Sequence, residues 1–180
     1  MKKRVFLTSV ITIAVLVLTC GLLAIPGQFA NIVSKNFSGY EVIFRYADIG
    51  GINYLEKNVA DSRASVAGIL ALVFILFALV SLVYSVISKD EEGKMPTAIL
   101  GGSCALISGI IFLTMYLWMA VIYKGSFALH WLTYVAGAFI TILGIALIVF
   151  GIMGIKENRA SLGSKSVKYN YLKTNKKENN

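Results

Sequence analysis

Four long runs of apolar residues dominate the chain, and the polar positions are gathered between and after them. The runs cover residues 5–25, 65–88, 96–123 and 131–155, and none of them contains Asp, Glu, Lys or Arg. A helix needs about 20 residues to cross the hydrocarbon core of a bilayer, so each run is long enough to span it. The pattern predicts an antiparallel, left-handed bundle of four transmembrane helices over residues 1–155, with an outer loop at 26–64.

Signals at the ends of these runs agree with this division. Pro26 and Gly27 end the first helix, because proline lacks the amide donor and glycine relaxes the backbone, and Asp61 or Ser62 can cap the second helix. The connection at residues 89–94 is short and charged, which predicts a hairpin of the second and third spans. The third run has about 28 residues, so its helix is expected to tilt or to project from the bilayer.

The positions of Lys and Arg predict the orientation. Of the 17 Lys and Arg residues, 12 lie before the first run, between the second and third, or after the fourth, and 5 lie in the other two connections. Cytoplasmic segments carry this excess in membrane proteins. We therefore expect both termini in the cytoplasm, and the net charge of +8 does not require a nucleic-acid partner.

The apolar runs contain little reactive chemistry. The chain is 57% hydrophobic and 14% charged, and ionisable groups inside a membrane are kept for function; their absence from the runs argues against a proton-coupled exporter, an antiporter or a voltage sensor. Cys20 and Cys104 are interpreted as packing residues, and the weak lipoprotein-like context of Cys20 favours an uncleaved first helix. His130, beside Trp131, is interpreted as an interface residue. We expect no enzyme activity, no metal and no cofactor.

The outer loop contains the most specific pattern in the sequence. From Tyr40 to Tyr46, aromatic and β-branched residues alternate with Glu41, Ile43 and Arg45, which favours a β-strand that returns over residues 52–55 after a Gly-Gly turn. The competing interpretation is a helix in which Glu41 and Arg45 pair at a spacing of four. The strand pair would give a small β-hairpin within the extracellular loop.

This loop has two possible roles. It can form a lid over its own helices, or it can present aromatic side chains to a partner, since aromatic residues are favoured anchors in interfaces. The candidate partner-binding residues are Tyr40, Phe44, Tyr46 and Tyr54, with Phe29 and Phe37 as further aromatic candidates.

Small residues recur at intervals of seven within three of the runs. They are Ala64 directly before the second run and Ala71, Ala78 and Ser85 in it, Gly102 and Gly109 in the third, and Gly137, Gly144 and Gly151 in the fourth. A spacing of seven keeps one stripe of a helix toward a partner, and small side chains let two backbones approach closely. The stripes predict packing within the bundle, with self-association as the alternative.

The order of these features resembles a group of uncharacterised small four-span membrane proteins of low-GC Gram-positive bacteria. Those proteins carry a similar Ser-Gly-aromatic-x-Val-Ile-Phe string after the first helix, as residues 38–44 do here, although glycine often follows it where this chain has Arg45. The resemblance implies a bacterial cytoplasmic membrane and no particular activity. The loop lengths are also similar to the claudin layout, without the Trp and the paired Cys of the claudin loop.

The tail at residues 156–180 is basic and is expected to be disordered in the cytoplasm. Lys156 and Arg159 lie closest to the fourth run, so they are the candidate contacts to anionic lipid headgroups. Taken together, the sequence favours a non-catalytic accessory, scaffold or sensor protein that binds a membrane protein partner or a second copy of itself. The alternatives are an oligomeric passive transporter or small channel, and an immunity or stress protein against membrane-active peptides.

Overall fold

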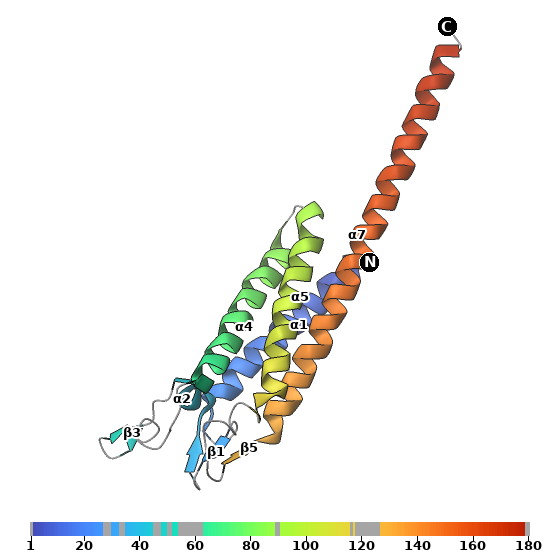
Figure 1. Ribbon diagram of the computed structural model, residues 1–180. Coiled ribbons are helices and arrows are strands. Elements are labelled where there is room, and N and C mark those ends of the chain that lie inside the picture. The colour runs from blue at the N-terminus through green and yellow to red at the C-terminus, as the bar shows by residue number, and fades with distance from the viewer. Residues whose placement is uncertain are drawn as a thin grey trace.

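Four long helices form the body of the protein in the computed structural model (Figure 1). The structure describes residues 2–26, 30–32, 35–44, 48–49, 52–53, 63–88, 91–115, 117 and 127–178. The long helices are α1 (Lys2–Ala24), α4 (Arg63–Ile87), α5 (Glu91–Leu113) and α7 (Trp131–Glu178). The short elements are β1 (Ala30–Ile32), β2 (Lys35–Phe37), α2 (Gly39–Phe44), β3 (Asp48–Ile49), β4 (Ile52–Asn53) and β5 (Phe127–Leu129).

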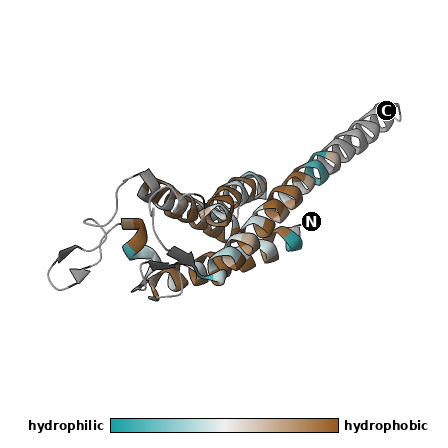
Figure 2. Cartoon of the chain, turned by 60° about the horizontal axis from the view of Figure 1, so that its bottom comes forward, coloured by the Kyte–Doolittle hydropathy of each residue, from teal (hydrophilic) through white to brown (hydrophobic). Residues whose placement is uncertain are grey.

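Each long helix is long and apolar enough to cross a membrane, as the sequence predicts. The qualifying segments are Lys3–Ala24, Val66–Ile87, Gly93–Leu113 and Trp131–Ala160. Their outward faces carry large apolar side chains, and Leu18, Val80 and Ile142 are each more than 60% exposed. Figure 2 shows hydrophobic residues, in brown, along the length of the helices. Apolar surface on this scale is rare on soluble monomers and is what a multi-pass membrane protein presents to lipid.

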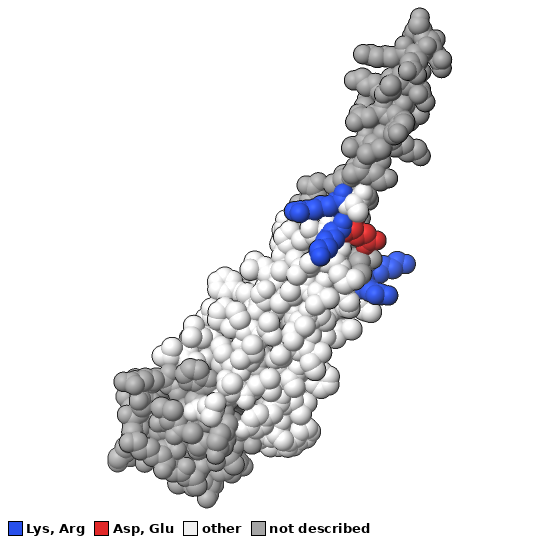
Figure 3. Space-filling view, turned by 45° about the vertical axis from the view of Figure 1, so that its right-hand side comes forward, with Lys and Arg blue, Asp and Glu red and all other residues white. Residues whose placement is uncertain are grey.

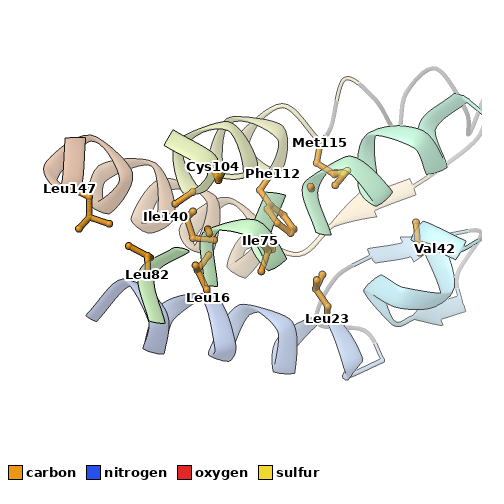
Figure 4. Close-up of a cluster of buried hydrophobic side chains, with 13 residues drawn as sticks. Leu16, Leu23, Val42, Ile75, Leu82, Cys104, Phe112, Met115, Ile140 and Leu147 are labelled. Carbon is orange, nitrogen blue, oxygen red and sulfur yellow. The ribbon is translucent and has the colours of Figure 1, made fainter. Parts of the chain in front are cut away.

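The four helices enclose a core of interlocking side chains. Helix α5 lies between α4 and α7, and α1 packs on α4 and α7. Leu16, Ile75, Leu82, Phe112 and Ile140 are almost completely buried, and Figure 4 shows them converging from all four helices. In lipid, where helix association depends on close packing rather than on the exclusion of water, these contacts hold the helices together.

The small-residue stripes of α5 and α7 face each other. A Cβ added to Gly144 would lie 2.7 Å from the backbone nitrogen of Leu106 and 2.8 Å from the carbonyl oxygen of Gly102. A Cβ added to Gly109 would similarly meet the backbone of Thr141 at 2.7 Å and the carbonyl oxygen of Gly137 at 2.9 Å. The predicted role of these glycines in packing is therefore correct, because only glycine allows this backbone contact.

The stripe of α4 also points inward. Ala71, Ala78 and Ser85 are buried, and the carbonyl oxygen of Ala78 lies 3.3 Å from a Cβ built on Gly101 of α5. Along these described positions the small residues are used within one chain, and they offer no spare stripe for self-association.

A three-stranded antiparallel sheet lies at one end of the bundle. It joins the connection between α1 and α4 to the connection between α5 and α7. Its order is β2-β1-β5, with Asn31 opposite Asn36 of β2 on one side and Ala128 of β5 on the other. Strands β1 and β2 belong to the first loop and β5 to the second, so backbone hydrogen bonds tie together two connections far apart in sequence. The pattern of the sequence did not indicate these three strands.

The sequence predicted a β-strand over Tyr40–Tyr46, and this prediction is wrong for the described part of the segment. Gly39–Phe44 form helix α2 instead. The residues expected to return as a strand include Ile52 and Asn53, which form β4, but its partner is β3 at Asp48–Ile49. Ser38, Gly39, Tyr40 and Glu41 match the Ser-x-x-Glu signature of a helix start, and this local signal outweighed the alternation of side chains.

Two further boundaries differ from the expectation. Helix α5 begins at Glu91, with Pro96 inside it, and ends at Leu113, ten residues before the predicted end of the third span; residues 118–126 lie outside the described part of the chain. The tail, expected to be disordered, continues α7 to Glu178. Extending an existing helix avoids the cost of a new nucleus.

The two ends of the bundle differ in character. The N-terminus and the extension of α7 lie at one end, and α2 and the strands lie at the opposite end (Figure 1). Because α1, α4, α5 and α7 alternate in direction, the turn from α4 to α5 belongs to the same end as the N-terminus.

Candidate partner-binding site

Helix α2 is held at its start by a reciprocal pair of side-chain and backbone hydrogen bonds. The Ser38 amide and the Ser38 hydroxyl both donate to Oε2 of Glu41, each at 2.7 Å. In return the Glu41 amide donates to the Ser38 hydroxyl oxygen at 3.2 Å. This capping box satisfies donors that a six-residue helix would otherwise leave open, and it gives a short segment a defined helical conformation.

The same helix is fixed to the bundle by two buried side chains. Val42 and Ile43 are 5% and 2% exposed, and α2 packs against α4 and α1. Ile43 occupies the space above Gly68 of α4: a Cβ added to Gly68 would lie 2.7 Å from Cγ1 of Ile43. Val42 extends the main core cluster, and Figure 4 shows it at the end where Leu23 lies.

Tyr40 adds a polar attachment to the same site. Its hydroxyl donates to the backbone carbonyl oxygen of Cys20 in α1, at 3.1 Å. Partial burial raises the pKa of the Tyr40 phenol, and the neighbouring Cys20 adds to the shift, so the hydroxyl keeps the proton that it donates. Tyr40 therefore serves to attach α2, which supports the interpretation of this segment as a lid over its own helices.

Phe44 behaves differently from Tyr40, although both were predicted to bind a partner. The two rings stack, with centroids 6.5 Å apart and planes inclined by 13°, but Phe44 is 57% exposed. The other two candidates, Tyr46 and Tyr54, lie outside the described residues, as does Phe29. Among the described candidates, Phe44 is the aromatic ring that α2 presents outward.

His130 and Trp131 mark the start of α7 at this same end. The Leu132 amide donates to Nδ1 of His130 at 3.3 Å, and the Thr133 amide donates to the His130 carbonyl oxygen at 3.0 Å. These contacts satisfy amides in the first turn of the helix. The Trp131 ring is exposed, 5.7 Å from the His130 ring.

The opposite end carries cations. The basic residues whose side chains the structure describes at that end are Lys3, Arg4, Lys94, Lys156 and Arg159. On the face shown in Figure 3 the charged residues gather where α7 leaves the bundle. Lys156, a predicted lipid contact, lines a cavity of about 490 Å³ together with Arg4, Met153 and Glu157. Arg159, the other predicted lipid contact, is exposed on α7.

The described residues contain potential metal ligands and two cysteine thiols. Across that part of the chain, no group of three His, Cys, Asp or Glu side chains lies close enough to hold a metal ion. Cys20 in α1 is half-buried and Cys104 in α5 is buried, and both are free thiols.

The hydroxyl groups within the spans are dispersed. Ser103 and Thr141 donate to carbonyl oxygens one turn back in their own helices, at 2.9 and 2.8 Å. Ser9 and Ser108 are buried without a hydrogen-bond partner among the described residues. None of Ser81, Ser103, Ser108 and Thr141 is among the described residues that line the three cavities given for this structure.

No protein-family model, no curated protein and no solved structure matches this chain.

Proposed function

We propose that this protein is an integral component of a bacterial cytoplasmic membrane, with four spans and both termini in the cytoplasm. The four apolar helices have the required length, and the excess of Lys and Arg in the predicted inner segments follows the positive-inside rule. The N-terminus and the extension of α7 lie at one end of the bundle, which is consistent with this topology. The sheet, α2 and a short β3–β4 hairpin would then form the outer face.

Within that membrane we propose a non-catalytic role as an accessory, scaffold or sensor protein that binds a membrane protein partner through the first outer loop. The observation that carries this proposal is the combination of Ile43 and Phe44 on one short helix. Ile43 is 2% exposed and seated on Gly68, whereas its neighbour Phe44 is 57% exposed. Because α2 is already fixed to the bundle, a partner can bury the Phe44 ring without a large loss of conformational entropy in α2.

The test is purification from native membranes in mild detergent, followed by mass spectrometry for companions present in stoichiometric amounts. Phe44→Ala removes the outward ring. Phe77→Ala is the matched control, because Phe77 is 60% exposed on α4 but lies within a span, where lipid surrounds it. A photo-crosslinking phenylalanine analogue placed at position 44 or 77 then reports which position contacts the companion.

We expect a companion that is retained with Phe77→Ala, lost with Phe44→Ala, and crosslinked from position 44. Tyr40→Phe keeps the ring and removes the hydrogen bond to Cys20, so it separates attachment of α2 from direct contact. A homo-oligomer without a companion, unchanged by Phe44→Ala, would overturn the docking role and leave α2 as a lid. Ion-flux assays for a channel and peptide-sensitivity assays on a deletion strain would then test the two alternatives.

A further inference from the structure

A cavity opens between α1 and the α4–α5 hairpin, at the end of the bundle where the chain begins. Its volume is about 480 Å³, within the range of about 300–1,000 Å³ that is usual for small-molecule sites. Residues of three helices line it, from the first turns of α1, the last turns of α4 and the start of α5. In the proposed orientation this is the level of the inner lipid headgroups.

The wall of this cavity is mainly apolar. Val5, Phe6, Leu7 and Met95 line it, and Val5 and Met95 belong to a buried cluster with Ala98. Among the described lining residues, the uncharged polar group is Ser85, whose hydroxyl donates to the carbonyl oxygen of Lys94 at 3.0 Å. That hydroxyl is already engaged in joining α4 to α5, so the interior is suited to a hydrocarbon chain.

The described lining also contains two cations. Lys3 comes from α1 and Lys94 from α5, so helix packing brings together two positive charges that lie far apart in sequence. An apolar chamber with two ammonium groups matches a molecule with a hydrocarbon chain and a negatively charged head. Basic pockets between membrane helices on the cytoplasmic side bind anionic lipid headgroups in this way.

We propose that this cavity is a binding site for an anionic glycerophospholipid of the inner leaflet. One acyl chain occupies the space beside Phe6, Leu7 and Met95, and the phosphate is held by Lys3 and Lys94. The site rests on the proposed membrane location but is independent of any protein partner at Phe44. It also differs from the general attraction of the basic tail to the membrane surface, because it requires a shaped apolar chamber.

The second cavity at this end provides the contrast. It is lined by Arg4, Lys156 and Glu157, with Met153 as its apolar member, so it offers charge without a comparable hydrocarbon wall. If the two described cations of each cavity alone attracted lipid, and Glu157 did not offset one of them in the second cavity, the two cavities would be equivalent. The proposed site predicts that they are not.

The experiment reconstitutes the full chain into nanodiscs with equal amounts of phosphatidylglycerol and phosphatidylcholine, and counts retained lipids by native mass spectrometry after detergent extraction. Lys3→Gln with Lys94→Gln removes two charges from the site. Lys156→Gln with Arg159→Gln removes the same charge outside it. Leu7→Trp keeps both lysines and fills the chamber. Circular dichroism confirms that each variant is folded.

We expect one tightly retained phosphatidylglycerol on the wild-type protein and on the Lys156→Gln, Arg159→Gln variant. At about 1 kcal/mol for each cation, removal of Lys3 and Lys94 weakens its retention about 30-fold, and Leu7→Trp abolishes it. Equal losses in both charge variants, or unchanged retention with Leu7→Trp, would overturn the site. Failure of the chain to enter nanodiscs would overturn the membrane location together with the lipid site. Insertion without specific lipid retention would overturn the lipid site alone.

Discussion

Replacing Gly144 by alanine tests how closely α5 and α7 approach each other. The new Cβ would lie 2.7 Å from the backbone nitrogen of Leu106 and 2.8 Å from the carbonyl oxygen of Gly102. Both neighbours are backbone atoms, so no side-chain rotation relieves the contact. Ordinary van der Waals contact begins at 3.4 Å, and the helices must therefore separate locally by about 0.7 Å, the difference between 3.4 and 2.7 Å.

The cost of this separation follows from the size of the gap. A gap of about 0.5–1 Å removes roughly a quarter to a half of the dispersion energy of the atoms that face it, and overpacked sites are typically destabilised by about 1–3 kcal/mol. Alanine gains about 1 kcal/mol over glycine in helix propensity in water, which masks part of the effect. A glycine without neighbours is needed to remove this contribution.

Gly21 supplies that control. It lies in α1, and a Cβ built on it meets nothing within 4 Å, so Gly21→Ala makes the same chemical change without a clash. Both variants gain the same helix propensity, so the difference between them reports the clash. The free energy of unfolding should be lower for Gly144→Ala than for Gly21→Ala by about 1–3 kcal/mol. Reversible unfolding in mixed detergent and SDS micelles measures both. Equal stability of the two variants would refute the close approach of α5 and α7.

The remaining predictions concern α2. Ser38→Ala removes the two capping hydrogen bonds of the Ser38 hydroxyl and keeps the one donated by its amide. We expect a loss of about 0.5–2 kcal/mol in the local stability of α2, measured as faster hydrogen exchange of the amides of α2; unchanged exchange would show that the hydroxyl is not needed. Ile43→Ala empties the space above Gly68 and should destabilise the protein by about 2–5 kcal/mol. Phe44→Ala should change the free energy of unfolding by about 0.5 kcal/mol or less, because surface substitutions have little effect. Similar losses for Ile43→Ala and Phe44→Ala in the same micelle assay would contradict the orientation of α2.

The conformation of residues 38–44 shows how two local signals can compete. The aromatic and β-branched residues favoured a strand, whereas Ser38 and Glu41 stood at the spacing of a capping box. The structure gives the helix, with the capping bonds in place. The capping signal is present in the sequence, and residues 39–44 follow it rather than the alternation of side chains.

The sequence by itself determined the properties that depend on runs along the chain. The number of spanning helices follows from the lengths of the apolar runs, and the charge difference between the two ends follows from the positions of Lys and Arg. The spacing of seven at Gly137, Gly144 and Gly151 also indicated a packing face before any partner was known. Each of these properties can be read from neighbouring residues.

Only the tertiary structure decided which surfaces meet. It placed Gly144 against Gly102, Ile43 over Gly68, and β1 beside β5, and it brought Lys3 and Lys94 to one cavity. These pairs depend on the rotation and separation of helices that are distant in sequence, and complementary shape fixes both. A single sequence lists the small, large and charged residues, but their contacts are determined when the helices pack.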